Sequence, residues 1–371
     1  MIDRSEVLAA AEGRSFTPAN LDRLAKQFGT ELAAWGLQQM DLRHRARAKF
    51  ALAEQMIFVK EGLEQSTSEA VAKFHADRFP EGEMVFDLTA GIGADTIALA
   101  RRGPVTAYEM DETRADCARW NLAVHGLDTA STTKIITGDC FDQAPWGRFV
   151  FADPARRSGG LRLTAGDEFS PNPAEIVECA TEVELGILKL SPMQRDEELS
   201  VYGPRVEFVS HRREGKEALV SFGPRAGEGF WATRAETGES VPRDEGYLPS
   251  VSVPDEFIYD ADPALVRAHA IRSVATSLRQ IGDTAGYLTG PLIDSPWLRR
   301  YSVIDFVRPD QKSVQAVLRR VGGFVEEVKQ RGAGVNAEKL RTTFRAEGDR
   351  KVSLMVITEG KGRRYALCEI A

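Results

Sequence analysis

Five acidic residues stand at or beside the ends of short apolar segments between residues 84 and 154. They are Asp87, Asp95, Glu109, Asp139 and Asp153. Parallel strands bring their carboxyl ends to one edge of a sheet, which is where open α/β sheets bind nucleotides. We therefore expect these carboxylates to converge on one ligand site.

The turn Ala90-Gly91-Ile92-Gly93 lies between Asp87 and Asp95. Its glycines let the backbone approach a ligand where a side chain would clash. A dinucleotide site would read G-x-G-x-x-G, whereas position 96 is Thr, so an oxidoreductase is the least favoured class. Flanking carboxylates suit a ligand with a cationic amino-acid end and no phosphate, and S-adenosylmethionine is such a ligand.

The acids of the next two segments each have two interpretations. Glu109, 18 residues after Gly91, could accept hydrogen bonds from ribose hydroxyls, or it could be a surface acid at a strand end. Asp139 follows Gly138 and could accept from an adenine amino group, or it could form a turn with that glycine.

The fourth segment ends in Asp153-Pro154. Pro154 has no N–H, which leaves nearby carbonyls free to accept from a substrate. Asp153 could orient a nucleophile or take its proton, and Arg156 and Arg157 could bind phosphate or stack on a base. The alternative is a structural turn with an Asp–Arg ion pair. Lys189, at the end of a fifth apolar run, either reaches the site or only borders it.

Apolar runs alternating with helical patterns predict the elements that would position these residues. Strands are expected at 84–88, 105–110, 134–137, 148–152 and 186–190, helices at 95–102 and 113–125, and a hairpin at 206–211 and 218–222. Apolar strands that alternate with helices indicate a parallel sheet covered on both faces. The expected fold class is α/β, with a Rossmann-like sheet over residues 81–225.

The flanking regions have different patterns. Residues 1–80 are expected to be helical, since Thr17-Pro18 is a helix start and Ser66-Thr67-Ser68-Glu69 is a capping-box signature. Residues 226–298 predict a small α+β linker unit, and residues 299–371 a basic α+β unit. Further helices are expected at 31–50, 263–280, 311–321 and 337–344, and a hairpin at 352–358 and 365–370.

The order D-x-x-A-G-x-G, an acid ending the second strand, G-D and then D-P resembles class I S-adenosylmethionine methyltransferases. The preceding segment 61–69 is similar to the lead of trimethylguanosine-synthase-like enzymes, in which a Gly-to-Thr stretch lies over the methyl donor. With Lys189-Leu190-Ser191-Pro192 and the C-terminal tail, the chain resembles a bacterial family that carries a THUMP-like C-terminal domain.

The resemblance implies a role for each matching residue. The donor turn would be Asp87, Ala90, Gly91, Gly93 and Asp95, with Thr67 above it, Glu109 on the ribose and Asp139 by the adenine. Asp153 and Pro154 would face the methyl acceptor, Arg156 and Arg157 would bind substrate, and no metal is implied. Exocyclic-amine methyltransferases carry a second proline and an aromatic residue where this chain has Ala155 and Arg156. Trp146 or Phe169 could supply an aromatic ring from elsewhere, or serve in packing.

Charge and composition limit the partners. The formal charge is −7, yet residues 299–371 hold 16 Lys+Arg and 9 Asp+Glu, which is compatible with a polyanion. True THUMP domains bind RNA, so the resemblance implies an RNA substrate. No apolar run predicts a membrane span, and four cysteines without a C-x-x-C pair fit a reduced, cytoplasmic protein. We expect an RNA methyltransferase. The alternatives are methyl transfer to protein or a small molecule, and a non-catalytic nucleotide- or RNA-binding module.

Overall fold

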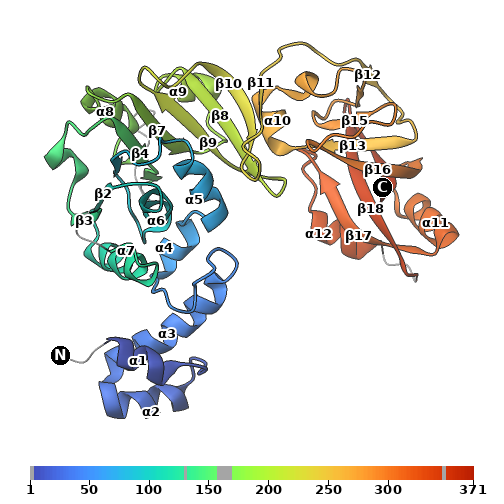
Figure 1. Cartoon of the computed structure of the whole chain (residues 1–371). Helices are drawn as coiled ribbons and strands as arrows, with labels where there is room; N and C mark the ends of the chain where they lie inside the picture. Colours follow the sequence, from blue (N-terminus) through green and yellow to red (C-terminus); the bar gives the residue numbers. More distant parts are fainter. Residues whose placement is uncertain (1–3, 129–131, 157–168, 345–347) are drawn as a thin grey trace. The chain divides into compact units, whose positions relative to one another are not determined.

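The computed structural model describes residues 4–128, 132–156, 169–344 and 348–371 (Figure 1). Contacts divide the chain into two compact units, Met1–Val206 with Leu219–Glu228 and Glu207–Ala218 with Gly229–Ala371. None of the helices in the described ranges has the length and apolar character that a membrane crossing needs. All four cysteines are free thiols, as expected from their spacing.

A nine-stranded sheet has the order β11-β10-β8-β9-β7-β4-β1-β2-β3. Its strands are β1 Val85–Asp87, β2 Val105–Glu109, β3 Thr133–Thr137, β4 Phe149–Ala152, β7 Leu185–Leu190, β8 Arg205–His211, β9 Glu214–Phe222, β10 Gly229–Arg234 and β11 Ser240–Pro242. β7, β4, β1, β2 and β3 run parallel, and α6 and α7 pack on β1 to β3. The predicted α/β fold with a Rossmann-like sheet is confirmed.

The hairpin of this sheet has a tighter turn than expected. Arg212 and Arg213 alone connect β8 to β9, with φ angles of 52° and 63°, the left-handed backbone of a type I′ turn. Two-residue turns of this hand match the twist of the strands they join, so β9 begins at Glu214 and not near residue 218.

The helices of the first unit precede, alternate with and follow the parallel strands. They are α1 Arg4–Ala11, α2 Pro18–Phe28, α3 Thr30–Ala46, α4 Lys60–Gln65, α5 Glu69–Ala76, α6 Ala94–Ala100, α7 Glu112–Val124, the 3-10 turn η1 Cys140–Gln143, α8 Pro173–Cys179 and α9 Asp196–Ser200. Thr17 caps α2 as predicted, since its hydroxyl accepts from the Asn20 amide at 3.3 Å. Val7, Leu24 and Leu37 belong to a core shared by α1, α2 and α3.

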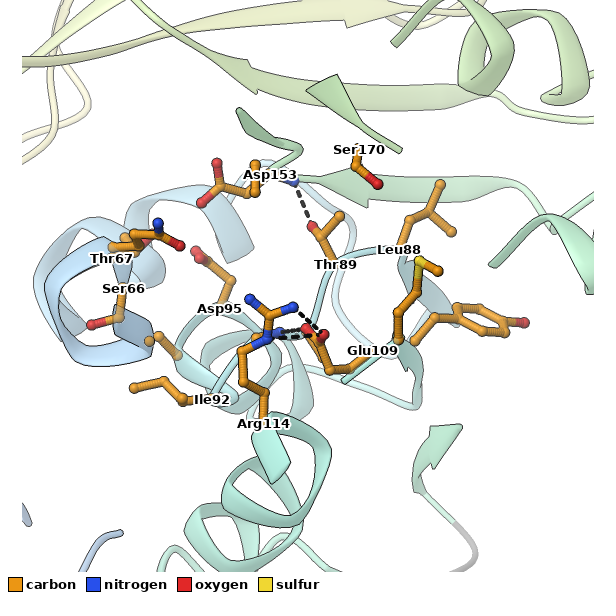
Figure 2. Close-up of a pocket in the computed structure, with 18 of the residues that line it drawn as sticks. Ser66, Thr67, Leu88, Thr89, Ile92, Asp95, Glu109, Arg114, Asp153 and Ser170 are labelled. Carbon is orange, nitrogen blue, oxygen red and sulfur yellow. Dashed lines mark hydrogen bonds and ion pairs between the residues drawn. The ribbon is translucent and has the colours of Figure 1, made fainter. Parts of the chain in front are cut away.

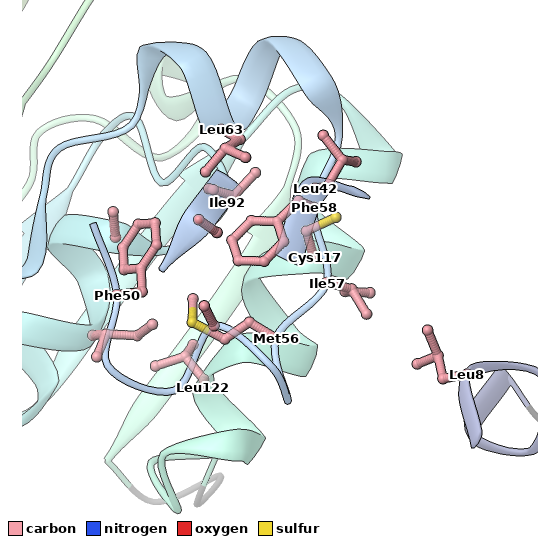
Figure 3. Close-up of a cluster of buried hydrophobic side chains, with 14 residues drawn as sticks. Leu8, Leu42, Phe50, Met56, Ile57, Phe58, Leu63, Ile92, Cys117 and Leu122 are labelled. Atoms are coloured by element: carbon pink, nitrogen blue, oxygen red, sulfur yellow. The ribbon is translucent and has the colours of Figure 1, made fainter. Parts of the chain in front are cut away.

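A buried cluster that includes Phe58, Ile92 and Leu122 joins α3 and the segment before α4 to the turn after β1 (Figure 3). The Asn121 side chain holds this junction from α7. It accepts from the Ile57 amide at 2.9 Å and donates to the carbonyls of Ile57 at 3.1 Å and Ile92 at 2.9 Å. Gln39 of α3 makes a similar pair of bonds to the backbone of Phe58, at 2.8 and 2.9 Å.

An eight-stranded sheet has the order β12-β14-β15-β13-β16-β19-β18-β17. Its elements are β12 Ser250–Val251, β13 Phe257–Ala261, α10 Pro263–Ala268, η2 Ile271–Ser273, β14 Arg279–Ile281, β15 Tyr287–Thr289, β16 Leu298–Val307, α11 Gln311–Val321, β17 Gly323–Gln330, α12 Ala337–Thr343, β18 Arg350–Glu359 and β19 Gly362–Ile370. Because β13 pairs with β16, the segments 226–298 and 299–371, expected as separate units, share this sheet. The predicted hairpin at its end is confirmed as β18 and β19.

The helix expected from 263 to 280 is shorter in the structure. α10 ends at Ala268, where His269 adopts a left-handed backbone with a φ of 56°. The chain then forms a 3-10 turn and enters β14, which pairs with β15. The apolar residues that suggested one long helix therefore belong to three short elements.

Candidate functional site

A pocket opens where β1, β2 and β4 end (Figure 2). Its lining comes from the lead segment 62–67, the turn after β1, the end of β2 with α7, and the residues that follow β4. Six of the predicted site residues line it, namely Thr67, Ala90, Gly91, Asp95, Glu109 and Asp153. The sheet edge thus brings together residues that lie up to 86 positions apart, as the alternating pattern predicted.

The two glycines of the turn have different tasks. Gly91 has a φ of 56° and lines the pocket with its backbone, and its amide donates to Oε2 of Glu109 at 2.9 Å. Gly93 has a φ of 90°, and a Cβ there would lie 3.2 Å from the Cα of Ala118 in α7. Gly93 therefore permits the close packing of the turn against α7 and does not line the pocket.

Asp87 lies beneath the turn and is fully buried. Its carboxylate accepts from the Thr89 amide at 3.1 Å and from the Thr96 hydroxyl at 2.6 Å. Burial raises the pKa of Asp87 to about 7, and the charges of Asp95 and Asp153 act in the same direction. Asp87 therefore shapes the turn and contributes its charge from below, without lining the pocket.

Asp95 faces the pocket from the first turn of α6, and Oδ1 lies 2.7 Å from Nδ1 of the buried His75 in α5. Burial alone would raise the pKa of Asp95, but the charge and hydrogen bond of His75, the charge of Lys189 and the hydroxyl of Thr67 together lower it. Asp95 is therefore held as a carboxylate. His75 had no sequence signal, because it is a single histidine in a helix far from any motif.

The predicted capping box at Ser66 to Glu69 is wrong. α5 begins at Glu69 with Ser68 as an N-cap that makes no side-chain bond. The Ser66 hydroxyl instead donates to the Leu63 carbonyl at 2.9 Å, and the Thr67 hydroxyl accepts from Lys189 Nζ at 3.0 Å. Tertiary partners thus replace the local cap, and Thr67 turns toward the pocket.

Lys49 fixes the lead segment above the turn. Its Nζ donates to the carbonyls of Leu63 at 2.7 Å, Glu64 at 3.1 Å and Ser66 at 2.7 Å, at the carboxyl end of α4. Gly62 of α4 lies against Ile92, so close that a Cβ would be 2.6 Å from the Ile92 Cγ2. The short helix α4 is therefore fastened at one end and packed without a gap at the other.

Glu109 ends β2 with both carboxylate oxygens engaged. Oε1 accepts from the Asp111 amide and lies 2.9 Å from Nη2 of Arg114, while Oε2 accepts from Gly91 (Figure 2). Arg114 and Met110 also line the pocket, and the Met110 side chain is 63% exposed. Neither residue was predicted to line the pocket. Met110 directly follows Glu109, a position from which an apolar side chain can contact an adenine.

Asp139 lies apart from this group. It is exposed and caps η1, where its carboxylate accepts from the Phe141 amide at 3.0 Å. It is absent from the described lining of the pocket.

Asp153 forms the far side of the pocket. Its amide donates to the Thr89 hydroxyl at 2.6 Å, and its Oδ2 lies 2.5 Å from Nζ of Lys189 in β7. Lys189 thus reaches the site. Pro154 is buried and lies outside the described pocket lining. Arg156 is described by its backbone in the strand β5, Ala155–Arg156, and Arg157 falls outside the described residues.

The two aromatic candidates serve in packing. Trp146 is buried and donates from Nε1 to the Cys140 carbonyl at 3.0 Å, and Phe169 is buried in β6, Phe169–Ser170, which pairs with β5. Ala155 and Ser170 line the acceptor side of the pocket. Within the described lining, Tyr108 contributes the aromatic ring, and it lies at the β2 side. On the acceptor side of the described site, therefore, no aromatic side chain takes the place of the ring that stacks on the target base in exocyclic-amine methyltransferases.

The pocket suits S-adenosylmethionine by its donor set. The Asp95 carboxylate in the lining favours a cationic amino-acid end, the Gly91 backbone allows close approach, and Met110 offers an apolar surface beside Glu109. Among the described residues, no three His, Cys, Asp or Glu side chains lie together so that they could hold a metal ion.

The parallel order β7-β4-β1-β2-β3, with a glycine turn after β1 and an acid after β2, defines the class I methyltransferase fold. A solved structure from Porphyromonas gingivalis W83, assigned as a methyltransferase, covers 100% of both chains with a TM-score of 0.74 and 21% identity. This likeness establishes the fold over the whole chain. No protein-family model matches the sequence.

Relatives by sequence agree with the fold. Two strains of Mycobacterium tuberculosis carry an uncharacterized S-adenosylmethionine-dependent methyltransferase that is 28% identical over 350 residues, 91% of this chain and 95% of the relative. The trimethylguanosine synthase of Schizosaccharomyces pombe is 34% identical over 73 residues, 20% of this chain and 30% of that protein. By fold, site and sequence, the chain is similar to S-adenosylmethionine-dependent methyltransferases.

Proposed function

We propose that this chain is an S-adenosylmethionine-dependent methyltransferase that modifies a nucleotide of RNA, and that donor and acceptor meet between Asp95 and Asp153. The observation that carries the proposal is the pocket, in which the donor turn and the Asp153 edge share one lining. When bound, S-adenosylmethionine supplies a methyl group already activated on a sulfonium, so the protein chiefly has to align the reactants.

On the donor side, each residue has a task that follows from its position. Asp87 and Asp95 attract the cationic amino-acid end, and Thr67 closes the pocket from above. Ala90 and Gly91 offer backbone to the ligand, and Gly93 keeps the turn packed. Glu109, oriented by Arg114, accepts from the ribose hydroxyls. Asp139, which caps η1, lies outside the described pocket lining, and its contact with the adenine stays a prediction.

On the acceptor side, Asp153 accepts a hydrogen bond from the N–H or O–H of the target and holds its lone pair toward the methyl group. Pro154 keeps the strand end rigid, since its ring fixes the backbone angle. Arg156 and Arg157 follow directly and bind the phosphates of the substrate in this proposal.

Support for RNA comes from the second unit and from the local likeness to trimethylguanosine synthase. Some cations of the second unit have their charge balanced in salt bridges, such as Arg341 with Glu338 and Lys351 with Glu326. Arg308, Lys312 and Arg363 make no salt bridge within the described chain. The register of β16 with β19 pairs Val307 with Tyr365, so Arg308 and Arg363 lie at one sheet end, where α11 with Lys312 begins. We propose that RNA phosphates bind there.

The first experiment is calorimetric titration with S-adenosylmethionine and S-adenosylhomocysteine, using Asp87→Ala and Glu109→Ala as controls. Binding that is lost in both variants supports the donor site and justifies a tritiated-methyl assay on total RNA. Wild-type protein that binds the donor but labels no RNA, while it labels protein or small metabolites, would favour the alternative substrate class.

The RNA surface has its own matched comparison. Alanine at Arg308, Lys312 and Arg363 together should weaken RNA binding and flatten its salt dependence, because each phosphate contact releases counterions. Alanine at the salt-bridged cations Arg341, Arg350 and Lys351 should change both much less. Equal effects of the two triple variants would contradict this surface.

A further inference from the structure

We propose that Lys189 is a positioning residue that fixes Asp153 and adapts the site to an electrically neutral acceptor, such as a nucleobase N–H, in preference to a cationic amine. This inference rests on the proposed function and deepens it, because it names the charge class of the acceptor. A methyltransferase of this fold could equally act on amines or on bases, so the distinction decides the substrate.

The sheet register places the two residues side by side. β4 and β7 run parallel with Ala152 beside Leu188, so Asp153, directly after β4, lies next to Lys189 near the end of β7. The ammonium lies 2.5 Å from Oδ2 of Asp153 and 3.0 Å from the hydroxyl of Thr67. The Lys189 side chain is 15% exposed and the Asp153 side chain 31%, so the pair is partly buried and only partly screened by solvent.

The Lys189 ammonium lies among several carboxylates. Asp87 ends β1, Asp95 lies in α6 and Asp153 follows β4, and His75 of α5 stands behind Asp95. The charge of Lys189 contributes to lowering the pKa of Asp95, so its influence extends from the acceptor edge to the donor turn. Thr67 connects the two sides, since it contacts Lys189 and also bonds to Asp95.

The pair determines which acceptor Asp153 can serve. A carboxylate already balanced by an ammonium attracts a second cation weakly and is a poor base for it. A protonated amine would have to lose its proton before it could attack, and nothing in this pair favours that loss. A neutral N–H or O–H needs only a hydrogen-bond acceptor, which the Asp153 carboxylate provides.

The resulting step balances without a further reactant. The acceptor lone pair forms the bond to the methyl carbon while the carbon–sulfur bond breaks and sulfur keeps the electron pair. The acceptor, now positively charged, releases its proton to solvent, and Asp153 holds the hydrogen bond throughout. Lys189 keeps its proton, so it orients Asp153 and takes no direct part in the transfer.

A binding test can measure the effect of the Lys189 charge independently of catalysis. Lys189→Met removes one positive charge from beside Asp153 and the pocket, so the affinity for the sulfonium donor should rise relative to the neutral S-adenosylhomocysteine by about three- to tenfold, as expected for one charge at effective protein dielectric. Lys189→Arg, which keeps the charge, should retain the wild-type ratio. An unchanged ratio in folded Lys189→Met protein overturns the inference.

A kinetic test can show whether Lys189 orients Asp153. At saturating donor, Lys189→Met should lower kcat on RNA by about 10- to 100-fold, a typical effect for lost orientation, with little change in KM for RNA, and Lys189→Arg should restore most of it. The pH–rate profile of Lys189→Met should lose activity at a higher pH on its acidic side, because a carboxylate without its ammonium takes up a proton more readily. A kcat of the Lys189→Met variant equal to that of the wild type would refute the positioning role of Lys189.

Substrate comparison completes the test. Wild-type enzyme that methylates the lysine amines of a basic peptide better than RNA would overturn the neutral-acceptor inference. Wild-type enzyme that labels no RNA at all would instead refute the proposed function, and the binding ratio would still report on the charge of Lys189.

Discussion

Adding one methyl group at Gly62 should weaken donor binding without unfolding the protein. A Cβ there would lie 2.6 Å from Cγ2 of Ile92 and 2.9 Å from Cγ2 of Val59, closer than unbonded carbons approach. Overpacking of this kind costs about 1–3 kcal/mol. α4 has 6 residues, so we expect it to move before the buried turn does. If the whole cost appears in binding, the donor Kd rises about 5- to 150-fold.

The assay is calorimetric titration of Gly62→Ala with S-adenosylhomocysteine, paired with thermal unfolding to show that the fold is retained. Gly215→Ala is the matched control, because its added Cβ would meet only Pro263, at 3.4 Å. That variant should bind the ligand as the wild type does.

A second substitution isolates the contact. Ile92→Ala removes the methyl group that the new Cβ would strike, so Gly62→Ala with Ile92→Ala should lose less affinity than the two single effects predict together. Wild-type affinity in Gly62→Ala would show that α4 does not form the roof of the donor pocket. Strict additivity would show that the two residues do not press on each other.

Three further predictions follow from buried polar groups. Since burial raises the pKa of Asp87 to about 7, its native form keeps a proton that the unfolded chain loses, and stability falls as pH rises between about 4 and 7. Asp87→Asn should therefore gain stability relative to wild type across this window, by up to about 4 kcal/mol in urea unfolding, and a pH-independent difference would refute the assignment. Asn121→Leu leaves three buried backbone groups unpaired and should cost about 2–5 kcal/mol in the same assay; a loss below about 1 kcal/mol, the worth of one hydrogen bond, would mean that water replaces the amide. Lys49→Met removes the donor to three carbonyls of α4, and the donor Kd should rise about tenfold, whereas an unchanged Kd would show that α4 holds its place without Lys49.

The parallel core was predictable because its signals are local. Short apolar strands that end in Asp87, Glu109 and Asp153 dictate both the sheet and the edge at which the acids meet. The turn between β1 and α6 has positive φ angles at Gly91 and Gly93. The spacing of these two glycines after the apolar strand was enough to predict the turn.

The supporting residues could not be predicted in the same way. His75, Arg114 and Lys49 act through partners that lie in other elements, and no spacing rule connects them. The capping-box expectation failed for the same reason, because Thr67 exchanges a local bond for one with Lys189, 122 positions later. In the second unit, short strands such as β12, β14 and β15 were not recognised, since two or three residues are too few to show a periodic pattern.

The bond between Ile57 and Asn121 also sets an order of events during protein synthesis. The two residues are 64 positions apart, and ribosomes add about 5–20 residues per second. The backbone of Ile57 therefore leaves the ribosome several seconds before Asn121, whose side-chain amide forms the hydrogen bonds to it. During that interval Gln39 can already engage Phe58, but the junction with the donor turn cannot close. The junction between the N-terminal helices and the donor turn therefore closes only after α7 has been synthesised, whereas the core that α1, α2 and α3 share can form earlier.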